Sequence, residues 1–175
     1  MTGGPKRRVP MTVTFFEMRT RPSALPPPAP KGRHAILKAE MPEVHFYRYL
    51  YDTVGGPYLW VDRKKLSPEA LSEIIQHPLN HLYVLYMEGA PAGMAELDFR
   101  KEGACNVTYF GLMPQAIGKR LGYFFLYHAC QNAWARPITR LTVNTCTLDH
   151  PRALPLYQRI GFTAYSREER FVELP

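Results

Sequence analysis

The chain has 175 residues, 46% hydrophobic and 13% aromatic, which is enough apolar material for one folded domain and argues against a disordered chain. Its net charge of +7 is concentrated in residues 1–33, which hold seven Lys and Arg against one Glu, whereas residues 34–175 hold 15 against 14. A nucleic-acid-binding domain carries its basic face on the folded part, so nucleic acid is not expected as a partner.

Residues 1–33 form a basic, proline-rich N-terminal arm. We expect residues 1–10 to be disordered, because they are rich in Gly, Pro and basic side chains. The alternation of apolar and polar residues over 11–18 predicts an outer strand, and Met11 is a candidate for the true start. The prolines of residues 21–32 predict a stiff, extended linker into the main domain.

Residues 34–175 form the main domain, with helices and strands in an irregular order. Ser67 before Pro68 reads as an N-cap followed by a Pro in the first turn of a helix, and Gly161 reads as the end of another helix. The predicted order is strand 34–40, helices 42–53 and 67–76, antiparallel strands 82–87, 92–100 and 105–113, helix 119–135, strand 140–146, a helix capped by Asp149, His150 and Pro151 and ending at 160, and closing strands 162–166 and 169–174. This order predicts a mixed α/β domain rather than a regular βαβ repeat.

The stretch 107–129 is expected to organise the rest, because it reads as a strand, a tight turn over 114–118 and a helix. Lys119 and Arg120 open that helix. Free N–H groups at a helix N-terminus point outward and the helix dipole adds to their attraction for anions. The stretch therefore predicts a site for a phosphate-bearing cofactor.

Three segments, 107–129, RLTVNTC at 140–146 and HPRALPLYQRIGF at 150–162, together resemble the GNAT superfamily of acetyl-CoA-dependent N-acyltransferases. The resemblance covers roughly residues 35–171. The family's asparagine–alanine–tyrosine–glycine–phenylalanine block reads here, at the family spacing, His150, Ala153, Tyr157, Gly161 and Phe162. It implies a single GNAT-like α/β domain with a central, mostly antiparallel, splayed sheet flanked by helices.

The resemblance also implies acetyl-CoA as the acyl donor, with no metal. The pantetheine arm would add to the open edge of a strand, and the pyrophosphate would sit on the N–H groups of the following turn. The residues implied are Phe110, Gly111, Leu112 and Met113 for the arm, Ile117, Gly118, Lys119, Arg120, Leu121 and Gly122 for the pyrophosphate, and Asn144 as a further contact.

Two positions in the turn depart from the family motif, Arg/Gln-x-x-Gly-x-Gly/Ala. Ile117 replaces the polar first residue and Arg120 replaces the first glycine. A positive φ at Arg120 would cost about 1–2 kcal/mol, and a charged hydrogen bond to phosphate would return about 1.5–3 kcal/mol. These ranges overlap, and a helix-opening Arg need not adopt a positive φ, so the sign of the effect stays open.

By the same resemblance, an amine attacks the thioester directly, with Tyr157 as the acid for the leaving thiolate. Asn106 stands where some relatives carry a glutamate base, and an amide cannot take a proton. Glu96 on the neighbouring strand is the first alternative, because apolar neighbours would raise its pKa, and Asp98 would share its face. A water chain is the second alternative.

The acceptor is expected to be a small-molecule or protein amine, bound near Trp60, Tyr58 and Tyr51, although each of these residues is equally consistent with the core. Asp149 and His150 are interpreted as helix caps rather than catalysts. The protein would be a monomer or homodimer. Arg120, Ile117 and Asn106 motivate a rival hypothesis, a degenerate GNAT-like CoA-binding or partner-binding module without turnover. A third hypothesis, which is less favoured, is nucleic-acid binding through residues 1–33.

The three cysteines, Cys105, Cys130 and Cys146, are widely spaced and lack a His partner at motif spacing, so we expect reduced thiols in or near the core and no metal site. The apolar runs are too short to span a membrane, and no charged start followed by an apolar stretch marks a signal peptide. A cytoplasmic enzyme without membrane contact is therefore expected.

Overall fold

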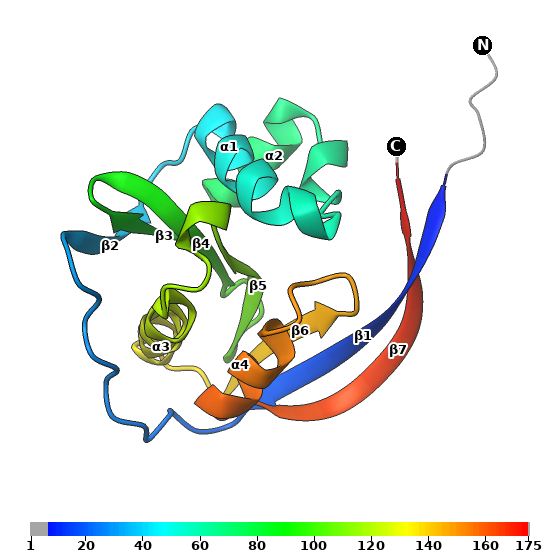
Figure 1. Ribbon diagram of the computed structural model, residues 1–175. Coiled ribbons are helices and arrows are strands. Elements are labelled where there is room, and N and C mark those ends of the chain that lie inside the picture. Colours follow the sequence, from blue (N-terminus) through cyan, green and yellow to red (C-terminus); the bar gives the residue numbers. More distant parts are fainter. Residues whose placement is uncertain (1–6, 175) are drawn as a thin grey trace, which may run out of the picture.

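The computed structural model describes residues 7–174 and contains one seven-stranded sheet in the order β2-β3-β4-β5-β6-β1-β7 (Figure 1). The strands are β1 (Arg8–Met18), β2 (His34–Ala39), β3 (Asn80–Met87), β4 (Ala90–Asp98), β5 (Ala104–Leu112), β6 (Arg140–Cys146) and β7 (Thr163–Glu173). The helices are α1 (Val44–Gly55), α2 (Pro68–Ile75), α3 (Leu121–Trp134) and α4 (Ala153–Ile160), with short 3-10 turns at Gly56–Tyr58, Arg63–Lys65 and Pro114–Ala116. The predicted mixed α/β domain is confirmed.

Helices cover both faces of the sheet, α1 and α2 on one face and α3 and α4 on the other (Figure 1). Each face buries its own apolar core. Phe125 and Leu126 of α3 are fully buried on one face, and Tyr47 and Leu50 of α1 are fully buried on the other. At roughly 1.5–3 kcal/mol for each fully buried large side chain, these two layers supply most of the favourable free energy of folding.

The sheet splays between β5 and β6, its one parallel pair among the described strands. Their ladder covers only Ala104–Val107 against Arg140–Val143. Beyond Val107, β5 continues to Leu112 with a partner only on its β4 side. The mostly antiparallel, splayed sheet is therefore confirmed, and the divergence leaves an open backbone edge along β5.

The first strand lies elsewhere than predicted. β1 begins at Arg8 rather than at residue 11, and it is inserted between β6 and β7 rather than lying on the outside of the sheet. Residues 8–10 are therefore strand and not disordered, whereas residues 1–6 lie outside the described part. Alternation shows that one face of a strand is buried, but it does not show which strands lie beside it.

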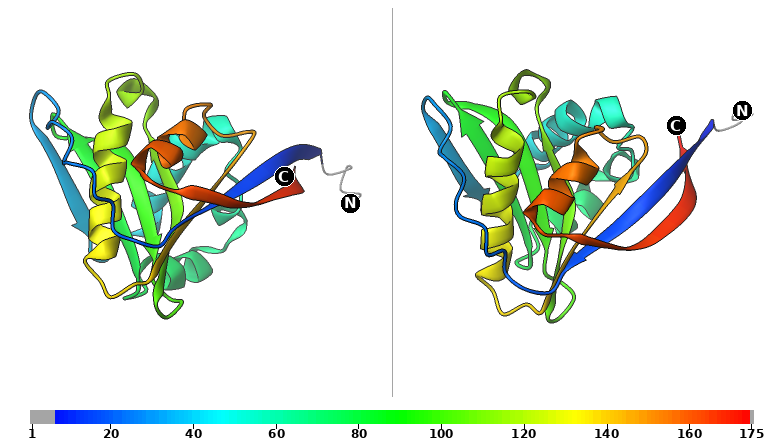
Figure 2. Two further views of the ribbon diagram at one scale, coloured as in Figure 1. Left: turned by 90° about the horizontal axis from the view of Figure 1, so that it is seen from below. Right: turned by 60° about the horizontal axis from the view of Figure 1, so that its bottom comes forward.

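The chain closes in one long strand, not two. β7 runs unbroken from Thr163 to Glu173, because it pairs with β1 along its whole length across one register shift at Phe15 and Phe16. The two strands form a curved ribbon that extends beyond the rest of the sheet, and the start of β1 lies beside the end of β7 at its tip (Figures 1 and 2).

The linker between β1 and β2 has no regular structure, as its prolines predicted. It crosses the outer side of α3 (Figure 2). At one end the Arg21 Nε donates to Gln131 Oε1 of α3 at 2.6 Å, and at the other the ring of His34 packs edge-on to Phe124 with 5.6 Å between centroids. The linker is thus fixed against α3 at both ends.

Two predicted helix starts have different outcomes. The Ser67 hydroxyl accepts from the Ala70 N–H at 3.2 Å, so the α2 cap is confirmed. Asp149 does not cap α4, which has Arg152 at its N-cap without a side-chain hydrogen bond, although His150 Nδ1 accepts from the Arg152 N–H at 3.1 Å. Within residues 7–174, no helix has the length and apolar character needed to cross a membrane.

Candidate active site

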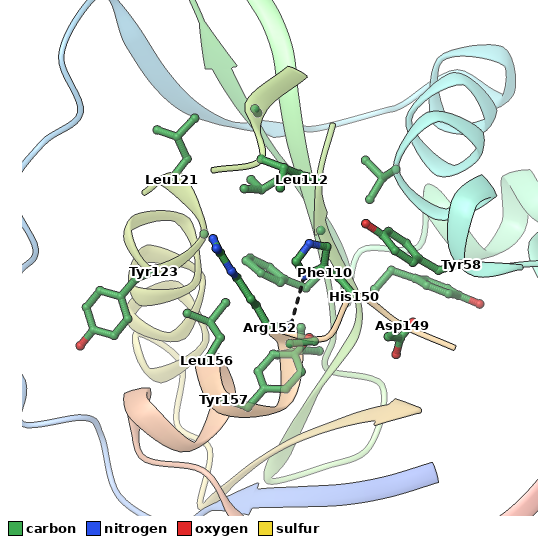
Figure 3. Close-up of a pocket in the computed structure, with 18 of the residues that line it drawn as sticks. Tyr58, Phe110, Leu112, Leu121, Tyr123, Asp149, His150, Arg152, Leu156 and Tyr157 are labelled. Carbon is green, nitrogen blue, oxygen red and sulfur yellow. Dashed lines mark hydrogen bonds between the residues drawn. The ribbon is translucent and has the colours of Figure 1, made fainter. Parts of the chain in front are cut away.

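A cavity of about 1720 Å³ opens where β5 and β6 diverge. It is lined by the far half of β5, the turn leading into α3, the loop between β6 and α4, and the segment after α1. Figure 3 shows its width, with Leu121 and Tyr123 of α3 on one side and Tyr58 on the other. The stretch expected to organise the chain does form one wall of this cavity.

The open edge of β5 provides Phe110, Gly111 and Leu112 to the cavity, and Asn144 faces it from β6. Gly111 is a close-approach position, because a Cβ there would lie 2.5 Å from the Val54 side chain. Met113 does not take part as expected. Its side chain is fully buried in the core beneath α1, and its N–H donates to the Ala92 carbonyl at 2.8 Å.

The turn from Ile117 to Gly122 lines the cavity throughout. Gly118 (φ 81°) and Arg120 (φ 60°, ψ 21°) are both left-handed, and Arg120 is the N-cap of α3. Arg120 therefore does adopt a positive φ, which the sequence left open. This conformation is strained for Arg, whereas the glycine of the family motif would adopt it freely. Within residues 7–174, the N–H groups of residues 118–120 have no backbone acceptor, so the turn has the donors an anion site needs.

Arg152 is a basic residue of this site that the sequence did not single out. Its side chain is exposed and reaches from the start of α4 toward the start of α3 (Figure 3). It lines the cavity together with Lys119 and Arg120. Only the folding of α4 against α3 brings it there, so no local pattern could have marked it.

Tyr157 lies in α4 at the inner end of the cavity, 4% exposed, with its ring packed near Phe110, Phe16 and Phe162. Its hydroxyl has no hydrogen-bond partner within residues 7–174. Burial, and then the nearby charge of Asp149, raise the pKa of Tyr157 far above that of a free tyrosine. The hydroxyl is therefore protonated at neutral pH.

Glu96 occupies a different setting from the one predicted. It is fully buried and does not line the cavity. Its carboxylate accepts from Tyr47 Oη at 2.5 Å, Arg63 at 2.5 Å and Asn80 Nδ2 at 3.1 Å. The prediction that Glu96 has apolar surroundings is wrong, because the guanidinium of Arg63 lies beside its carboxylate. This arrangement favours a structural ion pair over a catalytic base.

Asp98, which was expected to share the cleft-facing side with Glu96, also lies outside the cavity lining. Its carboxylate is bound by Arg100, with a shortest distance of 2.7 Å. Asn106 does line the cavity near the point where β5 and β6 separate. Its Oδ1 accepts from Thr142 Oγ1 at 2.9 Å, and its amide links the two diverging strands.

The side of the cavity away from α3 is aromatic. Four aromatic residues line it and form the aromatic wall: Tyr51, Tyr58, Trp60 and Tyr109. The ring centroids of Trp60 and Tyr109, and of Tyr51 and Tyr109, are each 4.9 Å apart. The structure thus brings together the three aromatic residues predicted from the sequence and adds Tyr109, which strand alternation alone did not indicate.

Asp149 joins this wall to the rest of the site. Its Oδ1 accepts from the Trp60 indole N–H at 3.2 Å, and its Oδ2 accepts from Thr145 Oγ1 at 2.7 Å and from the Cys146 N–H at 2.9 Å. Asp149 lines the cavity. Its hydrogen bonds hold the end of β6 in place, and it does not cap α4 as predicted.

The cysteines lie in or near the core as predicted, with Cys105 and Cys130 buried and Cys146 half-buried, and all three are free thiols. Burial raises the pKa of Cys130 to about 12. Across the described residues, no group of three or more His, Cys, Asp and Glu side chains is placed to hold a metal ion.

A family model described as acetyltransferase (GNAT) family matches residues 41–162, well over half of the chain. The chain belongs to the GNAT acetyltransferase family. A comparison with curated protein sequences finds no match.

Solved structures share the GNAT fold with this chain at low identity. A GCN5-related N-acetyltransferase from Kribbella flavida is 17% identical with a TM-score of 0.61, over 94% of this chain and 60% of that one. Another from Sphaerobacter thermophilus is 16% identical with a TM-score of 0.62, over 97% and 54%. An aminoglycoside acetyltransferase from an uncultured soil metagenomic sample, in complex with sisomicin, is 10% identical with a TM-score of 0.60, over 73% and 87%. The chain spans only 52% to 62% of several matched structures.

Proposed function

We propose that this GNAT protein transfers an acetyl group from acetyl-CoA to a primary amine by direct attack. The observation that carries the proposal is the meeting of three features in one cavity. These are the open backbone edge of β5, a turn with free N–H groups at the start of α3, and the buried, protonated hydroxyl of Tyr157.

The residues present fit acetyl-CoA as the acyl donor. The β5 edge at Phe110–Leu112 offers unpaired backbone groups to the amides of the pantetheine arm, with Asn144 facing it. The N–H groups of the α3 turn suit the pyrophosphate, and the cationic side chains of Lys119, Arg120 and Arg152 suit its negative charge.

The reaction consumes an ammonium and a thioester and yields an amide, a thiol and one proton. One proton leaves the ammonium, and the free amine forms the N–C bond as the C–S bond breaks. A second proton leaves the nitrogen, while Tyr157 supplies a proton to the thiolate and is then reprotonated. Holding the two reactants in one cavity makes the attack effectively unimolecular.

We assign the removal of the amine's protons to a water chain in the cavity and not to Glu96. The Glu96 carboxylate is fully buried and bound by Arg63, Tyr47 and Asn80, so it has no path to a bound amine. The acceptor amine, carried by a small molecule or a protein, would lie against the aromatic wall. We place the activity in the cytoplasm, where thiols such as those of Cys105 and Cys130 stay reduced.

The experiment is to measure thiol release from acetyl-CoA with and without each member of a panel of primary amines, and to titrate acetyl-CoA by calorimetry. Amine-dependent thiol release with a matching acetylated product is the expected result. Binding of acetyl-CoA without turnover on any amine would instead support the rival CoA-binding module. Failure to bind near millimolar concentrations would overturn both.

A further inference from the structure

The two ends of the cavity differ in charge. Besides the residues named next, Lys31, Asp62 and Glu88 line the cavity, and the two carboxylates are paired, Asp62 with Lys65 and Glu88 with Arg33. Lys119, Arg120, Arg152 and Arg159 line the end beside α3, where an anionic donor would bind. At the other end Asp149 lines the cavity beside Tyr58 of the aromatic wall (Figure 3). Arg170 also lines the cavity, from β7, but its guanidinium is bound to Glu168 at 2.6 Å. A cleft with segregated charge attracts partners of opposite sign to its two ends.

Asp149 is held in place by three hydrogen bonds and still faces the cavity. The Trp60 indole fixes one oxygen, while Thr145 Oγ1 and the Cys146 N–H fix the other. Each carboxylate oxygen has about two acceptor positions, so these three donors leave acceptor capacity unused. The charge of Asp149 contributes to the raised pKa values of both Tyr58 and Tyr157, so the carboxylate acts on the aromatic wall and on the proposed acid alike.

The aromatic wall adds a second attraction for a cation. Trp60 and Tyr109 are half-buried and line the cavity beside Asp149, and the fully buried Tyr51 packs against both with centroids 4.9 to 5.5 Å apart. The faces of aromatic rings carry partial negative charge and attract ammonium groups, best of all on Trp. Aromatic rings grouped around a carboxylate are the chemistry that binds alkylated ammonium ions.

One cation of the protein already lies over a ring of this wall. The guanidinium carbon of Arg63 is 5.4 Å from the Tyr109 ring centroid. Arg63 does not line the cavity, and its charge is matched by the buried Glu96 carboxylate. The charge of Arg63 is therefore neutralised inside the protein.

Deepening the proposed function, on which it rests, we infer that this end of the cavity is a cation site that captures the acceptor amine in its ammonium form, between Asp149 and the aromatic wall. The site takes aliphatic amines and alkylated ammonium ions, and it disfavours acceptors whose amine lies beside a carboxylate. Asp149 anchors the ammonium group of the acceptor and places its nitrogen near Tyr157 before the ammonium group loses a proton.

Choline and its uncharged isostere 3,3-dimethylbutan-1-ol test the site without any chemistry, because neither carries an amine that can be acetylated. Binding to the full chain is measured by calorimetry in the presence of acetyl-CoA. We expect choline to bind at least tenfold more tightly than the isostere and to compete with an amine substrate. Equal affinity for the two compounds would overturn the inference.

Two variants locate the effect. Asp149→Asn keeps an oxygen acceptor but removes the charge, and Trp60→Leu removes the indole but keeps the carboxylate. Each should reduce the preference for choline over the isostere by severalfold or more. Asp52→Asn is the matched control, because it removes an equal charge from an exposed carboxylate of α1 that lies outside this cavity and pairs with Lys64. A preference that survives in both cavity variants would contradict the assignment.

Titration of acetyl-CoA with the same proteins separates this inference from the proposed function. If acetyl-CoA binds and amines are acetylated while choline and its isostere bind alike, only the cation site is wrong. If choline is selected while acetyl-CoA neither binds nor reacts, the transferase function is wrong and the site binds cations without serving as an acceptor site. Unchanged acetyl-CoA affinity in Asp149→Asn and Trp60→Leu also shows that both variants are folded.

Discussion

Arg63 and Glu96 form a buried ion pair that ties the segment after α1 to the middle of β4. The two charged groups are 2.5 Å apart, and their side chains are 12% and 0% exposed. Tyr47 and Asn80 complete the hydrogen bonds of the carboxylate. The pair lies behind the aromatic wall, which it therefore supports from the interior.

Replacing Glu96 by Gln should destabilise the protein, because Arg63 would be left buried without its counter-ion. We expect a loss of about 3–5 kcal/mol in the free energy of unfolding, measured with urea. Asp98→Asn on the same strand breaks a more exposed pair with Arg100 and should cost less than about 1 kcal/mol. A stable Glu96→Gln protein that has lost its turnover would show instead that Glu96 is the base.

The sequence predicted most elements because their signals are local. The β6 strand was predicted with its observed bounds, and Ser67 correctly marked the start of α2. The surroundings of Glu96 were predicted wrongly for the opposite reason. Its apolar sequence neighbours say nothing of Arg63, which lies 33 residues away in the chain and supplies the charge.

The parts of the site that could be predicted from the sequence are likewise those with local signals. The turn at 117–122 and Tyr157 belong to contiguous motifs, so the sequence could mark them. Arg152 and Asp149 line the cavity only because of where their side chains point, which depends on the packing of α4 and on the end of β6. The place of β1 between β6 and β7 is likewise a non-local pairing that alternation cannot specify.

Replacing Arg120 by Gly should separate two effects of this residue. Glycine accepts the left-handed conformation at φ 60°, so we expect the free energy of unfolding to rise by about 1 kcal/mol. Loss of the cation should weaken acetyl-CoA binding, by up to about tenfold. Lys119→Ala removes a charge from the same turn without changing a strained residue, so it should weaken binding and leave stability unchanged. A destabilised Arg120→Gly protein would show that the conformation carries no strain.

Replacing Arg152 by Ala should weaken binding of acetyl-CoA by roughly 10- to 100-fold, as expected for a lost charged hydrogen bond to phosphate. Acetyl-pantetheine lacks phosphates, so the turnover of this shorter donor should not change. Arg19→Ala, which removes an exposed cation paired with Glu17 in β1, serves as the control. Equal losses with both donors would place Arg152 away from the phosphates.

The protein should lose stability above about pH 10, the ordinary pKa of tyrosine. Burial raises the pKa of Tyr47, Tyr51, Tyr58, Tyr83, Tyr109 and Tyr157. In the unfolded chain these tyrosines ionise near their ordinary pKa, whereas in the folded protein they stay protonated. The unfolded state then binds fewer protons, so the free energy of unfolding falls as pH rises, by up to about 1.4 kcal/mol per pH unit for each tyrosine. Urea midpoints that stay constant between about pH 8 and pH 11 would contradict this linkage.

The most direct test of acetyl transfer through this cavity is the turnover number of Tyr157→Phe beside that of Tyr165→Phe. Tyr165 is 48% exposed on β7 and lies outside the cavity, so its variant controls for the loss of a hydroxyl. With an amine that the wild type acetylates, Tyr157→Phe should lower kcat by about 100-fold or more while acetyl-CoA affinity stays unchanged, and Tyr165→Phe should leave kcat unchanged. An unchanged kcat in Tyr157→Phe would remove Tyr157 from the mechanism.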